Sequence, residues 1–256
     1  MSRSLALSLA ALAVLACAPA AAAPPVRMEI VDRDSGRWLE QYPHPGDTWI
    51  AGTPGHRYAV RLTNTTGERV LVVLSVDGVN AVTGQTADPA QAGYVLAPWQ
   101  SAEIAGWRKS HHEVAQFVFT ALPDSYAART GRPDHIGTIG IAAFRERRPR
   151  TPSAPPPIAR DAAPAKSRAP APTAETAGSM AAVPQRIGTG HGEHAWSPAA
   201  QTTFDRSSRP AQITQLRYDT PAALAARGIL PAARWSRHRP RAFPGGFVPD
   251  PPGRWR

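Results

Sequence analysis

The residues best suited to chemistry in this chain are aromatic rings interleaved with cations in two short segments. The six residues are Trp107, Arg108, Lys109, Tyr126, Arg129 and Arg132. Guanidinium groups bind carboxylate or phosphate oxygens in pairs, and aromatic rings attract cations and stack on flat groups. The two segments therefore predict a site for an anionic or glycan ligand. The alternative is that Trp107 and Tyr126 close the end of a core, with Arg129 bonded to loop carbonyls.

A second group could hold a metal ion, because imidazole and carboxylate side chains are metal ligands. His191, Glu193 and His194 lie close enough in sequence to share an ion on a helix or turn. However, glycine occupies every second position from 188 to 192, and no further ligands follow at a recognisable spacing. A Gly-rich turn is therefore favoured over a metal site. The sequence predicts no cofactor.

Catalytic patterns are absent from the sequence. There is no Gly-x-Ser-x-Gly nucleophile elbow, and Ser, His and Asp residues are scattered without a local arrangement. Residues of a catalytic triad meet in space rather than in sequence, so an enzyme on this fold stays open as an alternative. The sequence favours a non-enzymatic protein.

The first 22 residues read as a signal peptide. Arg3 supplies a positive start, about 12 apolar residues follow, and an Ala-rich stretch offers small residues to a peptidase. The apolar run is too short to span a membrane, which needs roughly 20 residues. Cys17, the single cysteine, ends this run. It is either a lipidation site, where Leu15 fits poorly, or a chance residue in a cleaved leader.

The charge changes sharply along the chain. Residues 26–146 carry 11 basic and 13 acidic side chains, whereas residues 147–256 carry 17 basic and 6 acidic ones. Residues 147–185 hold nine Pro and 11 Ala with few large apolar side chains, which predicts a disordered linker. Residues 231–256 are rich in Arg and Pro and are predicted to form a disordered basic tail. Such a tail suits acidic polymers or lipid headgroups, or it is simply solvated.

Residues 26–146 contain many short β-type runs separated by turn residues. The segment 58–64 alternates with period two, and 70–76 is almost wholly apolar, which is typical of a central strand. Asp77-Gly78 after that run indicates a tight turn rather than a cation loop. No amphipathic helix stands out. We therefore predict an all-β fold, an antiparallel, jelly-roll-like β-sandwich.

Residues 186–230 regain structural signals after the linker. The segment 212–218 reads as a strand, and Thr220-Pro221 reads as the start of a short helix that ends at Gly228. So few core side chains cannot support a domain of their own. This segment is therefore predicted to dock onto the sandwich as a strand–helix module.

Several stretches of the chain resemble a family of uncharacterised exported proteins of Proteobacteria. They are SVDGVN (75–80), GYVL (93–96), GWRKS (106–110), SYAARTGRP (125–133) and IGTGHGE (187–193). The resemblance covers most of 26–146 and part of 186–230. It implies export and a shared two-part design. The family has no assigned activity, so it implies no catalytic residue.

Together these observations predict a periplasmic or secreted binding or interaction protein, with an outer-membrane lipoprotein as the alternative. The expected partner is an anionic envelope component, such as a glycan, a phospholipid or a lipopolysaccharide headgroup, or another envelope protein. A purely structural envelope component and a glycan- or metal-active enzyme remain open, since one fold hosts many functions. No nucleic acid partner and no transmembrane helix in the mature chain are expected.

Overall fold

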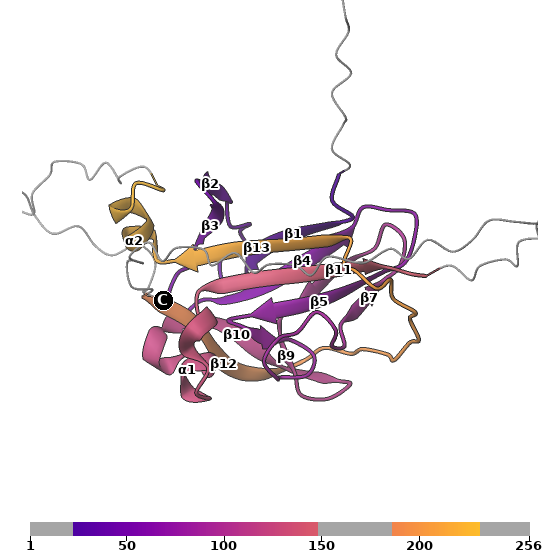
Figure 1. Ribbon diagram of the computed structural model, residues 1–256. Coiled ribbons are helices and arrows are strands. Elements are labelled where there is room, and N and C mark those ends of the chain that lie inside the picture. The colour runs from indigo at the N-terminus through magenta and orange to yellow at the C-terminus, as the bar shows by residue number, and fades with distance from the viewer. Residues whose placement is uncertain (1–22, 148–185, 231–256) are drawn as a thin grey trace, which may run out of the picture.

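A computed structural model describes residues 23–147 and 186–230, which form a sandwich of two β-sheets (Figure 1). The predicted signal peptide with Cys17, nearly all of the predicted linker and the predicted basic tail lie outside the described residues. Among the described residues, no helix is long and apolar enough to cross a membrane. The predicted all-β sandwich is confirmed.

The first sheet has the strand order β1-β4-β10-β12, with β8 paired to β4 and β9 paired to β10. Its strands are β1 (Val26–Asp32), β4 (Arg57–Asn64), β8 (Ser101–Ile104), β9 (Gly106–Arg108), β10 (Glu113–Ala121) and β12 (Ile187–Trp196). All of its pairings are antiparallel. Because β4 and β10 pair only near Tyr58 and Phe117, β8 and β9 fill the space where these two strands diverge.

The second sheet has the order β2-β3-β13-β11-β5-β6, with β7 also paired to β5. Its strands are β2 (Tyr42–His44), β3 (Asp47–Ala51), β5 (Val70–Val76), β6 (Val79–Asn80), β7 (Tyr94–Leu96), β11 (Thr138–Arg145) and β13 (Gln212–Asp219). Here β13 runs parallel to β3 and antiparallel to β11. The sheet is therefore mixed.

The core lies between the two sheets and follows the alternation of the strands. In β1 the buried apolar side chains are Val26, Met28 and Ile30, which face the core. In β5 both faces are buried, as predicted, because Leu71 and Val73 pack with Ala142 and Phe144 on the outer side. The burial of these apolar side chains is the main stabilising term of the fold.

The strands β12 and β13 are integral to the sandwich, one in each sheet. β12 pairs along β10 at the edge of the first sheet, and β13 lies between β3 and β11 in the second. A segment with few core side chains of its own is thus held by strand pairing on both sides of the sandwich. The strands of this predicted module are therefore part of the two sheets, and the module does not dock on the outside of the sandwich.

The prediction of a Gly-rich turn around residues 188–192 is wrong, because these residues belong to the strand β12. The glycines serve close packing rather than a bend. A Cβ atom at Gly188 would lie 2.6 Å from Cβ of Ser125 and 2.8 Å from Cγ2 of Ile136. At Gly192 it would lie 2.6 Å from Cγ2 of Val118. Only glycine lets neighbouring atoms come this near to the strand.

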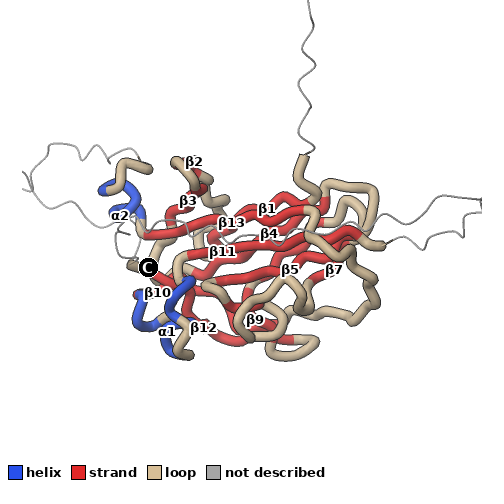
Figure 2. The backbone as a smooth tube through the Cα atoms, in the orientation of Figure 1, coloured by secondary structure: helices blue, strands red, loops and turns tan. Residues whose placement is uncertain are grey.

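Both α-helices lie at the same end of the sandwich (Figure 2). The predicted helix is confirmed as α2 (Pro221–Ala226), where Oγ1 of Thr220 accepts a hydrogen bond from N of Ala223 at 3.1 Å. The other, α1 (Tyr126–Arg129), is a single turn too short to show periodicity in the sequence. It lies between two short 3₁₀ turns, η1 (Leu122–Asp124) and η2 (Pro133–His135).

Candidate functional site

The two predicted aromatic and cationic segments meet through their rings. Trp107 on β9 is only 3% exposed, and its ring contacts Phe117 edge-on with centroids 4.8 Å apart. The ring centroid of Tyr126 lies 4.9 Å from that of Trp107. Trp107 therefore belongs to the core and packs against Tyr126, so it does not offer a face to a surface ligand. This matches the end-closing alternative for Trp107.

Tyr126 is half-buried against the core and has cationic neighbours. The guanidinium of Arg132 lies 5.7 Å from the centroid of the Tyr126 ring and donates to the carbonyl oxygen of Gly84 at 3.1 Å. Arg129 follows on the same helical turn and is exposed. A cavity of about 330 Å³ opens here, lined by Asp124, Tyr126, Arg129, Thr130 and His191. We call it the α1–β12 cavity.

A β-bulge brings the two predicted metal-binding histidines to the same area. The pairing of β12 with β10 shifts between Ala115 and Phe117, which face His194 and His191. An extra residue in a strand reverses the alternation of faces, so side chains three apart point the same way. The rings of His191 and His194 are consequently 5.9 Å apart, and His191 lies 5.8 Å from Tyr126.

The third predicted metal ligand does not join them. Glu193 is an electrostatic neighbour of Arg57, whose pKa it helps to raise. The carboxylate nearest to His194 is that of Glu113, 3.8 Å from Nδ1. Burial lowers the pKa of His191, and electrostatic interaction with Lys109 and His194 lowers it further. Arg129 and Lys109 bring positive charge close to the two histidines, which disfavours a metal cation there.

Arg108 lies apart from the other predicted residues. Successive side chains of a strand point to opposite faces, so Arg108 points away from Trp107. Its guanidinium lies 5.8 Å from the ring of Tyr94 and donates a hydrogen bond to the carbonyl oxygen of Ser197. The predicted residues therefore do not form one site: Trp107 lies in the core, and Arg108 lies on another side of the molecule from Tyr126 and Arg129.

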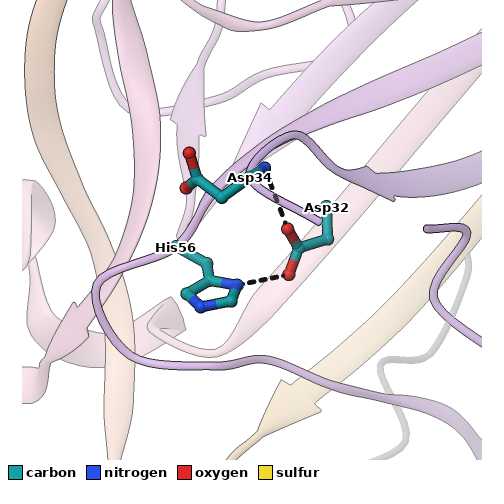
Figure 3. Close-up of side chains that lie close together, drawn as sticks. All are labelled: Asp32, Asp34 and His56. Carbon is teal, nitrogen blue, oxygen red and sulfur yellow. Dashed lines mark hydrogen bonds and ion pairs between the residues drawn. The ribbon is translucent and has the colours of Figure 1, made fainter. Parts of the chain in front are cut away.

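Sequence reasoning missed a cluster of two carboxylates and an imidazole at the end of β1. Asp32, Asp34 and His56 each offer an atom within 4.8 Å of the others (Figure 3). Nδ1 of His56 lies 2.7 Å from Oδ2 of the buried Asp32. Oδ1 of Asp32 accepts hydrogen bonds from the backbone N of Asp34 at 3.0 Å and of Ser35 at 2.9 Å.

Each carboxylate of this cluster already has a cationic or hydrogen-bonding partner. Burial acts to raise the pKa of Asp32, but the hydrogen bonds from Ser35 and His56 outweigh it and hold the pKa below its usual value. Hydrogen bonds from Arg57 lower the pKa of Asp34. A metal ion would compete with the Arg57 guanidinium for Asp34. The cluster orients His56 as an Asp–His dyad, and no described hydroxyl or thiol bonds to its imidazole.

Only a weak sequence signal marked this cluster. Asp32 and Asp34 form an Asp-x-Asp pattern, but His56 lies 24 residues beyond Asp32. The pairing of β1 with β4 is what brings them together, since Asp32 lies opposite Tyr58.

A buried polar network joins the two sheets around Asp77. Oδ1 of Asp77 accepts from the hydroxyl of Tyr218 at 2.6 Å and from N of Gly137 at 2.9 Å, and Oδ2 accepts from N of Thr189 at 2.7 Å. The hydroxyl of Thr189 also lies 2.6 Å from that of Tyr58. Burial raises the pKa of Asp77 to about 6, against the lowering effect of these bonds. Asp77 and Gly78 both have positive φ, which confirms the predicted tight turn between β5 and β6.

No family model, no curated protein and no solved structure matches this chain.

Proposed function

We propose that this is an exported, non-enzymatic binding protein of the bacterial envelope, which holds an anionic group in the α1–β12 cavity. The observation that carries the proposal is the unpaired charge at this cavity. Neither Arg129, which lines it, nor the nearby Lys109 forms an ion pair with any described residue. An anion would supply the missing counter-charge, because guanidinium and ammonium groups bind carboxylate and phosphate oxygens.

The cavity also offers a ligand an aromatic ring and a hydroxyl group, in addition to positive charge. The ring of Tyr126 gives a rigid apolar wall between Arg132 and His191, and Thr130 offers a hydroxyl group. Asp124 is the one acidic side chain among its lining residues, so an anion would bind at the side away from it. The volume of about 330 Å³ suits a single headgroup or sugar unit, at the lower end of the range for ligand sites.

The expected partner is an anionic component of the envelope: a glycan, a phospholipid or lipopolysaccharide headgroup, or an acidic surface of another envelope protein. The leader sequence supports a periplasmic or secreted location, with Cys17 as the lipid anchor in the alternative. The basic residues beyond 230 would add electrostatic attraction to the same partners.

Vesicle binding tests the proposal. The full-length protein is mixed with phosphatidylglycerol vesicles, and with phosphatidylcholine vesicles as the neutral reference, and the bound fraction is measured by sedimentation. Arg129→Gln is expected to weaken binding about fivefold, since one basic residue near an anionic surface is worth about 1 kcal/mol. Arg37→Gln, an exposed arginine in the turn after β1, is the matched control.

Two outcomes would overturn the proposed site. Equal losses in the two variants would show that only overall charge matters. Unchanged binding in both would place the contact elsewhere in the chain. If phosphatidylglycerol vesicles fail to bind, soluble lipopolysaccharide is the second probe, and failure of both would overturn a lipid headgroup as the ligand and weaken the binding role in favour of the structural one.

A further inference from the structure

A second cavity lies on another side of the sandwich, where Arg108 points. Its volume is about 790 Å³, within the range of ligand-binding sites. One wall is formed by β7 and β8, and the other by residues 197–203, which follow β12. In Figure 1 this connection, in orange, runs along the side of the molecule next to β7. We call it the β7–β8 cavity.

Two edge strands border this cavity. β7 pairs only with β5, and β8 pairs only with β4. Every second residue of an edge strand directs its amide and carbonyl groups away from its partner strand. Among the described residues, no hydrogen bond reaches β8 from the side away from β4. The cavity is therefore bordered by backbone groups that can still pair.

The opposite wall is fixed at its two ends. N of Ser197 donates to the carbonyl oxygen of His112 at 2.7 Å, and N of Ala199 donates to that of His111 at 2.8 Å. At the other end, Arg69 donates to the carbonyl oxygen of Thr203 at 2.7 Å. Ala200 lies exposed between these anchors and lines the cavity. The wall can thus keep its place while a ligand enters beside it.

The side chains of the cavity disfavour a sugar. Stacking on a sugar ring needs an open aromatic face, and Tyr94 is the one phenol or indole ring among the lining residues. Its ring is mostly buried, and the guanidinium of Arg108 lies 5.8 Å from its centroid. The partly exposed aliphatic side chains of Val95 and Ala102 instead offer places for the alternate side chains of a strand.

We infer that the β7–β8 cavity binds an extended peptide, which pairs with the free edge of β8 and directs a carboxylate towards Arg108. Addition of a strand to an exposed edge is a recurring mode of peptide recognition, in which main-chain hydrogen bonds provide affinity. Glu103, the acidic lining residue, already pairs with Arg61 at 3.7 Å. Arg108, which forms no ion pair with a described residue, therefore leaves this cavity with one cation that has no counter-charge. This inference is independent of the anionic site at the α1–β12 cavity.

The test uses the full-length protein and a phage-displayed library of random heptapeptides. Ala200→Trp fills the cavity from its exposed wall, and Ala222→Trp on the exposed face of α2 is the matched control. Circular dichroism checks that both variants are folded. We expect peptides to be enriched at least tenfold on the wild-type protein and on Ala222→Trp, but not on Ala200→Trp. Equal enrichment on all three, or none on the wild type, would overturn the inference.

A second measurement separates strand addition from other binding. The best synthetic peptide is compared with a copy that carries N-methyl groups on alternate amides, which removes backbone donors and keeps every side chain. Two sets of alternate amides can be methylated, and we expect one of the two methylated peptides to bind at least tenfold more weakly. We also expect at least tenfold slower hydrogen exchange of every second β8 amide in the complex. If a chitin hexasaccharide displaces the peptide while β8 exchange is unchanged, the cavity is a glycan site and the inference is wrong.

Discussion

The hydroxyl group of Tyr218 lies 2.6 Å from the carboxylate of Asp77, a residue 141 positions earlier in the chain. Both are fully buried, and Thr189 completes the contact with hydrogen bonds to each. β12, β13 and the turn after β5 are thereby joined at one point inside the sandwich. A polar group that loses its partner in such a place is costly, because no water can replace the bond.

Tyr218→Phe removes this hydroxyl group and keeps the ring. We expect the free energy of unfolding to fall by about 1–3 kcal/mol, because Asp77 and Thr189 each lose a buried partner. Urea denaturation followed by fluorescence measures the change. Tyr42→Phe is the control, since the Tyr42 hydroxyl bonds to Glu40 at the surface and should cost less than about 0.5 kcal/mol. Equal losses of unfolding free energy in the two variants would show that the buried hydrogen bonds of Tyr218 add nothing to stability.

The stability of the protein should depend on the ionisation of Asp77. Burial raises its pKa to about 6 in the folded state, against 3.8 in an unfolded chain. The folded state therefore binds the proton more tightly, so this stabilising contribution is complete below about pH 4 and is lost as the pH rises through 6. The loss is about 3 kcal/mol at most. Urea denaturation of the wild type and of Asp77→Asn at pH 4.5 and pH 7 measures this loss of unfolding free energy. An equal pH dependence in the two proteins would contradict the role of Asp77.

Gly188→Ala should be strongly destabilising, because its Cβ atom would overlap Ser125 and Ile136. We expect a loss of about 1–3 kcal/mol, as for other overpacked positions. Gly67→Ala is the matched control, since its Cβ would have only Trp99 nearby, at 3.9 Å. Thermal denaturation of both variants gives the comparison. A Gly188→Ala protein as stable as the control would mean that β12 can shift away from α1 without cost.

His56→Ala should raise the pKa of Asp32, because the carboxylate loses its imidazole partner and keeps its burial. A carboxyl group whose pKa is lowered by folding stabilises the fold at pH values above its pKa in the unfolded chain. This contribution is lost as the pH falls through the pKa of the folded state. We expect the variant to lose about 1 kcal/mol at neutral pH, since His56 is 38% exposed and the pair is partly screened. Carbon-13 NMR titration of Asp32 tests the shift, with His44→Ala as the control. An unchanged titration would show that the backbone hydrogen bonds alone hold down the pKa of Asp32.

The sequence predicted those parts of the fold that local patterns determine. Alternation and apolar runs located strands such as β4, β5 and β13, and Thr220 marked the start of α2 within one residue. It failed where packing overrides propensity, as at Gly188, where glycine is required by close neighbours within a strand. It also could not detect contacts that depend on register. The bulge that brings His191 beside His194, and the pairing that brings His56 to Asp32, have no local trace in the sequence.

The position of β13 has a consequence for how the chain is made. Its neighbours β3 and β11 belong to residues synthesised long before it, so the second sheet stays split until Asp219 has emerged. Until then β11 presents an open, apolar edge that other chains can pair with. The second sheet can close only after β13 has been made, and pairing between strands so far apart in the chain makes folding slow by topology. A nascent or truncated product that ends before this point is the form most exposed to aggregation and to chaperones.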